Sequence, residues 1–194
     1  AFAVIGAVIL AAGGSVRLGQ AKQVLDFHGQ PLVRRIARAA LDAGCAPVAI
    51  VLGRDREAIA AALQNLNVQV VPNDRWKEGL GSSIRAGVQA LLECEMVVIA
   101  TCDQPHVDAE LIRRLITAQA ETRQPIVASA YSGTYGVPAL FLRRYFNDLL
   151  SLPNEHGAKA IMARHPAEVA SIDFPQGAID IDTPADYRAL QASP

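Results

Sequence analysis

The sequence predicts a three-layer α/β/α fold around a mostly parallel β-sheet. Two observations support this class: short apolar, β-branched segments alternate with amphipathic segments along most of the chain, and the apolar segments are continuous rather than alternating in polarity. Strands buried on both faces have continuous apolar sequences, and strands joined through helices are normally parallel. No linker or repeat interrupts this order, so we expect one domain over residues 1–194, with an irregular region near residues 131–177.

The expected elements follow one another in a regular order. The apolar segments predict strands over residues 4–10, 48–52, 68–71, 96–101 and 126–130. Between them, apolar residues recur with helical spacing over residues 31–44, 57–66, 83–92 and 108–122. In the first of these helices, Pro31 suits the first turn and Gly44 suits the helix end. The later pattern predicts short helices near residues 143–150 and 158–164, a strand over residues 178–182 and a helix over residues 184–191.

Composition and charge exclude several classes of protein. Hydrophobic residues form 51% and charged residues 19% of the chain, and the net charge is -1, which is typical of a folded globular protein without a nucleic-acid partner. Three widely spaced cysteines, with no C-x-x-C pair, argue against a disulfide framework or a zinc knuckle and favour the cytoplasm. The first apolar segment is too short to span a bilayer, and no basic residue precedes it. We therefore expect a buried strand there and no membrane association.

Residues 10–22, with the sequence LAAGGSVRLGQAK, form a glycine-rich loop after the first expected strand. Gly14 and Gly19 have the spacing of a P-loop, but Gln20 and Ala21 stand where that motif requires Lys and Ser or Thr. The glycine spacing does not match the dinucleotide-binding fingerprint either. The loop is therefore a glycine-rich turn of another kind.

The same loop carries groups that suit a polyphosphate. Its glycines make backbone N–H groups approachable, Ser15 adds a hydroxyl, and Arg17 and Lys22 add two cations. In a parallel α/β sheet, ligands bind beyond the carboxyl ends of the strands, which is where this loop is expected. A plain turn with two solvated cations is the alternative interpretation.

Two acidic positions are candidate metal ligands. Asp103 directly follows the apolar segment of residues 96–101, and a carboxylate at the end of a central strand suits Mg2+. The competing role, capping of the next helix, fits Asp108 better. Asp180 and Asp182 are two residues apart on an expected strand, so their side chains would share one face and favour a cation between them. The alternative is that Asp182 caps the last helix, and a metal role for Asp180 stays open.

Residues 73–87 offer a further anion site. They combine a turn with Gly79, Gly81, Ser82 and Ser83 at the start of an expected helix, and helix N-termini with hydroxyl groups suit anions or the polar edge of a base. Capping alone would also explain the two serines. The four histidines share no metal-ligand spacing, and no Ser-His-Asp or Cys-His arrangement is evident.

Taken together, these segments resemble the molybdopterin nucleotidyltransferase family, a branch of the Rossmann-like, nucleotide-diphospho-sugar-transferase-like α/β fold. Residues 10–22 match the pattern L-A-A-G-x-S-x-R-x-G-x-x-K at each defined position. The resemblance extends over nearly the whole chain and includes the stretches GQPLV (29–33), EGLGSSIRAG (78–87), DQPHV (103–107), GVPALF (136–141) and DIDTPADY (180–187).

The resemblance implies a site for a nucleoside triphosphate and Mg2+. Catalysis would depend on Arg17 and Lys22, which neutralise the phosphates, and on Asp103, which binds the metal together with Asp182. The implied nucleotide contacts are Leu10, Ala11, Ala12, Gly13, Gly14, Ser15, Arg17, Lys22, Asn73, Gly81, Ser82 and Ser83. The motif L-A-A-G is similar to the cytidylyl-transferring branch and L-A-G-G to the guanylyl-transferring branch, so the pair Ala11-Ala12 favours CTP.

The implied reaction is transfer of CMP from CTP to the phosphate of molybdopterin or molybdenum cofactor, with release of pyrophosphate. A molybdenum-dependent hydroxylase or its chaperone is the implied protein partner. The acceptor would lie against Gly136, Pro138, Gly157 and Lys159. Val137 stands where the cytidylyl type often has His, and residues 155–159 read E-H-G-A-K instead of D-x-G-A-R. These departures leave open another NTP or acceptor, such as GTP or a sugar or alditol phosphate, and a nucleotide-binding carrier or chaperone.

Overall fold

The computed structural model describes residues 3–15 and 17–193, which form a seven-stranded sheet in the order β5-β4-β1-β6-β8-β7-β9. Among the described strands of this sheet, β8 alone runs antiparallel to its neighbours, which confirms the mostly parallel sheet. The strands are β1 (Ile5–Ala11), β4 (Val48–Leu52), β5 (Gln69–Pro72), β6 (Met96–Thr101), β7 (Ile126–Tyr131), β8 (Thr134–Leu142) and β9 (Val169–Asp173).

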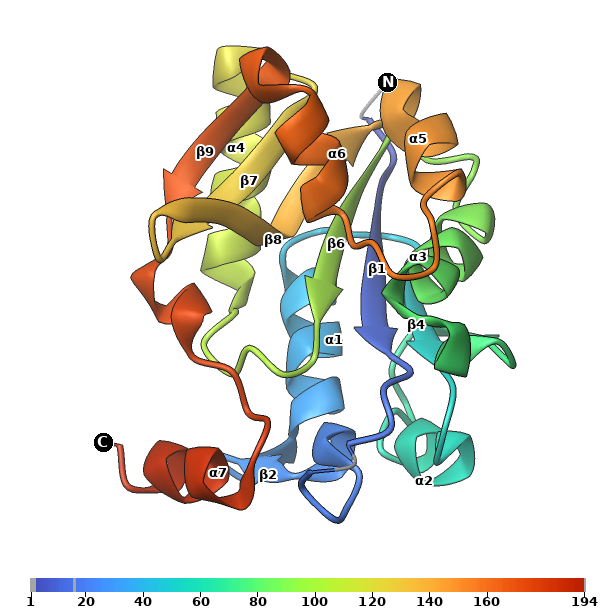
Figure 1. The fold of residues 1–194 in the computed structure, drawn as a ribbon, viewed down its shortest axis with the longest axis vertical. Coiled ribbons are helices and arrows are strands. Elements are labelled where there is room, and N and C mark those ends of the chain that lie inside the picture. Colours follow the sequence, from blue (N-terminus) through green and yellow to red (C-terminus); the bar gives the residue numbers. More distant parts are fainter. Residues whose placement is uncertain (1–2, 16, 194) are drawn as a thin grey trace.

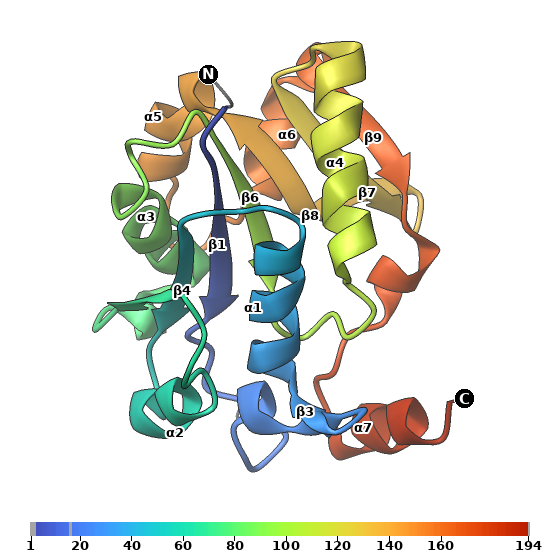
Figure 2. The ribbon, with the colours of Figure 1, turned by 180° about the vertical axis from the view of Figure 1, so that it is seen from behind.

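Helices cover both faces of the sheet, so the three-layer prediction is confirmed (Figures 1 and 2). One face packs against α1 (Leu32–Asp42), α2 (Arg56–Ala61) and α4 (Ala109–Thr122). The other packs against α3 (Leu80–Gln89), α5 (Phe146–Leu150) and α6 (Lys159–Arg164). Strand β1 shows the division, because Ile9 belongs to the first core and Val8 and Leu10 to the second. Over residues 3–15 and 17–193, no helix has both the length and the apolar character needed to cross a bilayer.

A third, smaller core lies beyond the carboxyl ends of the strands. It joins the glycine-rich loop, the hairpin of β2 (Asp26–Phe27) and β3 (Gln30–Pro31), and α7 (Pro184–Gln191). Figure 1 shows α7 and β2 together at the bottom of the molecule, and the Tyr187 hydroxyl donates to the Asp26 carbonyl oxygen at 2.8 Å. This core brings the last part of the chain next to the first loop.

The predicted strand over residues 178–182 is wrong. The last strand is β9, followed by the 3-10 helix η5 (Pro175–Ala178) and by residues 179–182 without regular structure. The Ile181 N–H donates to the Asp103 carbonyl oxygen at 3.1 Å, and the Ile181 side chain is fully buried in the small core. One anchored apolar residue between two aspartates therefore produces the alternating pattern that resembled a strand.

The expected irregularity near residues 131–177 is also wrong for residues 134–142 and 169–173. Residues 134–142 form β8, which pairs with both β6 and β7, and residues 169–173 form β9, which pairs with β7. Turn-forming residues at the start of the segment serve a hairpin, because Ser132 and Gly133 connect β7 to β8 with positive φ values. The sheet thus continues through a region that the sequence pattern left unassigned.

Candidate active site

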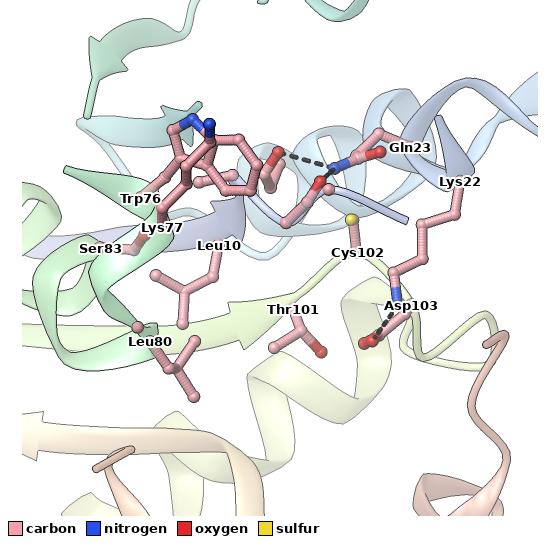
Figure 3. Close-up of a pocket in the computed structure, with 15 residues that line it drawn as sticks. Leu10, Lys22, Gln23, Trp76, Lys77, Leu80, Ser83, Thr101, Cys102 and Asp103 are labelled. Carbon is pink, nitrogen blue, oxygen red and sulfur yellow. Dashed lines mark hydrogen bonds and ion pairs between the residues drawn. The ribbon is translucent and has the colours of Figure 1, made fainter. Parts of the chain in front are cut away.

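A cleft of about 360 Å³ opens at the carboxyl ends of β1 and β6. Its walls are residues 10–14, 76–77, 79–80 and 101–103, together with Lys22, Gln23 and Ser83. Leu10 pairs with Thr101 in the sheet, so the loops that follow β1 and β6 face each other. Figure 3 shows Trp76 and Leu80 toward one end of the cleft and Lys22 and Asp103 toward the other. One end of the cleft is therefore mainly apolar, apart from Lys77, whose Nζ atom lies 5.6 Å from the centre of the Trp76 ring, and the other end is charged.

The glycine-rich loop has backbone N–H groups without partners beside this cleft. Within the described part of the chain, the N–H groups of Ala12, Gly13 and Gly14 donate no hydrogen bond, although all three residues line the cleft. A Cβ atom added to Gly13 would meet no other atom within 4 Å, so the backbone is open there. Successive free N–H groups of this kind form an anion-binding concavity.

Lys22 lies at the charged end of the cleft and contacts Asp103 and Asp182, which belong to separate segments of the chain. Its Nζ atom is 2.9 Å from Asp103 Oδ2, 3.1 Å from Asp182 Oδ1 and 3.3 Å from the Ile181 carbonyl oxygen. Burial by itself would lower the pKa of Lys22, but the Asp103 carboxylate and the hydrogen bonds to both aspartates raise it above its ordinary value. The ammonium group therefore stays charged.

Arg17 lies outside this cleft. Its guanidinium is 3.2 Å from Asp182 Oδ2, and 71% of its side chain is exposed. The structure thus brings four predicted residues together, namely Arg17, Lys22, Asp103 and Asp182, with the lysine partly buried and the arginine at the surface.

The two aspartates fit a divalent metal that arrives with a nucleotide. Asp103 and Asp182 both reach the same ammonium group, so a single cation can contact both carboxylates. Mg2+ is commonly bound by one or two carboxylates plus substrate phosphates. Over the described residues, no group of three or more His, Cys, Asp and Glu side chains forms a metal site made by the protein alone. Burial, followed by repulsion from Asp103 and Asp182, raises the pKa of the nearby Asp180 to about 6.

Asp103 and Asp182 do not cap the helices that follow them in the described structure. Asp108 caps α4 by accepting from the Leu111 N–H at 2.8 Å, as expected. Thr183, and not Asp182, caps α7, in a capping box with Asp186. Asp103 and Asp182 therefore have no competing role at a helix end.

Four other predicted nucleotide contacts have mainly structural partners. Ser15 accepts from the Lys22 N–H at 3.1 Å and lies outside the cleft lining. Asn73 Nδ2 donates to the hydroxyl oxygens of Ser82 at 2.9 Å and Ser83 at 3.0 Å. A Cβ atom on Gly81 would lie 2.0 Å from the Pro153 carbonyl oxygen, so this glycine allows close packing. Helix α3 begins at Leu80 without a side-chain cap, and only Ser83 of the Asn73 network lines the cleft.

None of the four predicted acceptor residues lines the cleft, as far as the described residues define it. A Cβ atom on Gly136 would lie 2.2 Å from the Tyr131 hydroxyl oxygen, and the Pro138 carbonyl accepts from the Ser129 hydroxyl at 2.6 Å. Gly157 packs against Leu80, which does line the cleft, and the exposed Lys159 begins α6 nearby in the sequence. Of the four predicted acceptor residues, Gly157 is therefore the one that packs against a residue of the cleft wall.

Sequence reasoning missed Gln23, Trp76 and Cys102. The Gln23 side chain is 1% exposed and donates to two loop carbonyl groups, and Trp76 packs over Gly14 and Gly53. The only available signals were the position of Gln23 directly after Lys22 and a lone tryptophan in a polar segment. Burial raises the pKa of Cys102 to about 12, so this residue lines the cleft as a neutral thiol.

Comparison with known proteins identifies the family. The family described as "MobA-like NTP transferase domain" matches residues 7–169. "Nicotine blue oxidoreductase" from Paenarthrobacter nicotinovorans is 36% identical over 126 residues, which are 64% of this chain and 61% of that protein, so the chain spans less than two thirds of this relative. "Molybdenum cofactor cytidylyltransferase" from Escherichia coli strain K12 is 23% identical over 184 residues, which cover 94% and 93% of the two chains.

Solved structures agree with this assignment. The crystal structure of Rv0371c from Mycobacterium tuberculosis H37Rv has a TM-score of 0.78 and 29% identity, and the match covers 98% of both chains. A complex of Rv0371C with manganese has a TM-score of 0.73 and 26% identity over 97% of this chain and 99% of that chain. Because the family match covers most of the residues described above, the chain belongs to the MobA-like NTP transferase family and has the fold of a nucleotidyltransferase.

Proposed function

We propose that the protein transfers CMP from CTP to the phosphate of molybdopterin or of its molybdenum-loaded form, with Mg2+ as the metal and the cytoplasm as its location. The observation that carries this proposal is the meeting of Lys22, Asp103 and Asp182 beside a loop with free N–H groups. The pair Ala11-Ala12 favours CTP, and the name of the Escherichia coli relative supports both the nucleotide and the acceptor.

The two ends of the cleft suit the two parts of a nucleotide. The free N–H groups of Ala12, Gly13 and Gly14 and the charged Lys22 would bind phosphate oxygens through several charge-assisted hydrogen bonds. The apolar end, with Trp76 and Leu80, would contact the flat face of the base. Binding at both ends would hold the α-phosphorus between the loop and Asp103.

Chemistry would depend on position and charge rather than on a general base. An oxygen of the acceptor phosphate forms a bond to the α-phosphorus of CTP while the bond from that phosphorus to pyrophosphate breaks. A phosphate monoester with a second pKa of about 6 is already an anion at neutral pH. None of the described histidines lines the cleft, which agrees with a reaction that requires no proton removal.

Asp103 and Asp182 would hold Mg2+, which supplies positive charge to the reacting phosphates as a Lewis acid. Lys22 would then donate to a phosphate oxygen in place of a carboxylate. Arg17, exposed beside Asp182, would offset the charge that grows on the departing pyrophosphate.

This proposal has less support for the acceptor than for the nucleotide. Val137 and residues 155–159 depart from the cytidylyl pattern on the side that would face the acceptor. A sugar or alditol phosphate in place of molybdopterin, or GTP in place of CTP, is therefore the second candidate within the same chemistry. A molybdenum-dependent hydroxylase or its chaperone would receive the product of the main reaction.

The decisive experiment measures pyrophosphate release from CTP, GTP, ATP and UTP, each with Mg2+ and with freshly prepared molybdopterin or its molybdenum-loaded form. We expect release that is selective for CTP and dependent on the acceptor. CTP binding without release would overturn the catalytic proposal and favour a carrier, and binding of no NTP would overturn the nucleotide site. Release with GTP alone would assign the protein to the guanylyl-transferring branch.

A further inference from the structure

The buried amide of Gln23 connects three points of the glycine-rich loop. Its Nε2 atom donates to the carbonyl oxygens of Ala11 and Gly13, both at 2.9 Å, and its Oε1 atom lies 3.4 Å from the Ser15 hydroxyl oxygen (Figure 3 draws the two Nε2 bonds). The side chain is 1% exposed and belongs to the 3-10 helix η1 (Lys22–Val24), directly after the cleft lysine. Both amide hydrogens therefore have partners within the loop.

These two bonds determine where the loop's own donors point. In a planar trans peptide, the carbonyl of one residue and the N–H of the next point in opposite directions. A carbonyl of Ala11 that faces Gln23 turns the Ala12 N–H away from it, and a carbonyl of Gly13 does the same for the Gly14 N–H. These are two of the three N–H groups that donate no hydrogen bond in the described part of the chain.

Trp76 packs over Gly14, and Arg54 Nη1 lies 3.5 Å from the Gly14 carbonyl oxygen, but the peptide at Gly13 has little else to hold this arrangement. A Cβ atom on Gly13 would contact nothing within 4 Å, so no packed side chain restrains the peptide there. Glycine also has the greatest backbone freedom of all residues. Without a clamp, the peptide groups on either side of Gly13 could rotate and withdraw their N–H groups from the cleft.

We propose that Gln23 is a positioning residue that fixes the orientation of the phosphate-binding N–H groups before the nucleotide arrives. The inference rests on the proposed function for the identity of the ligand, but the clamp itself is a property of the free protein. The position requires two donors and no charge. An ionised Glu of the same shape would place an oxygen against two carbonyl oxygens, and a Met of similar length would offer no donor.

The test compares Gln23→Glu and Gln23→Met with Gln20→Glu, which adds the same charge to an exposed position of the same loop. At pH 8, titration calorimetry with Mg-CTP should give affinities ~10-fold or more below wild type for both Gln23 variants. Gln20→Glu should remain within about 3-fold of wild type, because it adds only a solvated charge. Wild-type affinity in both Gln23 variants would overturn the proposal.

The pH dependence separates positioning from a general loss of structure. At pH 5.5, the buried carboxyl of Gln23→Glu should be protonated and able to donate one hydrogen bond, since burial raises the pKa of a Glu side chain. Its affinity relative to wild type at the same pH should then recover at least several-fold, whereas Gln23→Met should show no recovery. An equal deficit of Gln23→Glu at both pH values would contradict the clamp.

A second measurement needs no nucleotide. The amide resonances of Ala12 and Gly14 in free protein labelled with ¹⁵N should move in Gln23→Glu at pH 8, return toward the wild-type positions at pH 5.5, and stay near them in Gln20→Glu. If wild type binds no NTP while these resonances behave as described, the clamp stands and the proposed function fails. If the resonances do not respond while CTP binds normally to all variants, the clamp fails and the proposed function stands.

Discussion

Two polar regions of the molecule, the glycine-rich loop of the cleft and the network around Gln104 beside β8, use their polar groups differently. On the side of the glycine-rich loop, backbone donors of residues 12–14 have no partner within the described chain. On the side of β8, polar groups have internal partners: Gln104 Nε2 donates to the carbonyl oxygens of Val137 and Gly177, both at 3.0 Å, and lies 3.3 Å from the Tyr131 hydroxyl oxygen. Residues that match a family motif therefore have free backbone donors in the loop and internal hydrogen-bond partners beside β8.

The largest effect is expected from substitutions at the charged end of the cleft. Lys22→Ala or Asp103→Ala should lower the rate of pyrophosphate release by ~10²-fold or more, because each removes an electrostatic stabiliser of the transition state. Arg188→Ala, which removes an exposed cation on α7, should leave the rate unchanged. Near-normal rates in both site variants would show that the charged end of the cleft is not where the chemistry occurs.

Alanine substitutions at Gly81 and Gly13 compare a glycine that is required for packing with a glycine whose backbone is open. Gly81→Ala should lower the free energy of unfolding by about 2 kcal/mol, because the added methyl group meets the Pro153 backbone. Gly13→Ala should change it by less than about 0.5 kcal/mol, since the methyl group projects into open space. Urea denaturation of both variants gives the comparison. Equal stabilities would mean that Gly81 does not pack as described.

Lys159 is the sharpest probe of the acceptor side. Lys159→Ala should raise the KM for the acceptor by ~10-fold through loss of a charged donor to its phosphate, with no change in the KM for CTP. Arg164→Ala is the matched control, because Arg164 is also an exposed cation on α6. A rise in the KM for CTP, or equal effects of the two substitutions, would argue against an acceptor contact at Lys159.

The smallest effect concerns His106, on the same loop as Asp103. Burial, followed by repulsion from Arg35 and His28, lowers the pKa of His106 below its ordinary value of 6.5. The unfolded chain therefore binds this proton more tightly, so stability is full above pH 6.5 and falls as the pH drops. His106→Gln should show a shallower loss of stability between pH 7.5 and 5.5 in chemical denaturation. An unchanged slope would mean that His106 makes no contribution.

The sequence predicted most of the fold and part of the site. Continuous apolar segments identified β1, β4, β6 and β7, because strands covered on both faces leave a strong pattern. A short apolar segment also identified β5, although this edge strand is mostly exposed. The same logic failed at residues 178–182, where the buried Ile181 between two aspartates imitates a strand. Asp103 and Asp182 were predicted to bind one metal ion; the structure places both carboxylates beside Lys22 Nζ, and the metal role stays a prediction.

No sequence pattern predicts the clamp formed by Gln23 or the packing of Gly81. The clamp formed by Gln23 depends on where its amide points, and no periodicity reports the direction of one side chain. The structural use of Gly81 likewise depends on the Pro153 carbonyl, which lies 72 positions away in the sequence. Contacts of this kind are decided by tertiary packing rather than by local preference.

The contacts of Lys22 join segments of the chain that are synthesised at different times. Its two carboxylate partners lie 81 and 160 positions further along the chain. Contacts with such long separations form late, because closing a long loop costs entropy before any contact stabilises it. A ribosome exposes the glycine-rich loop before Asp182, so a growing chain carries the lysine without its second carboxylate while the 160 positions that separate them are added.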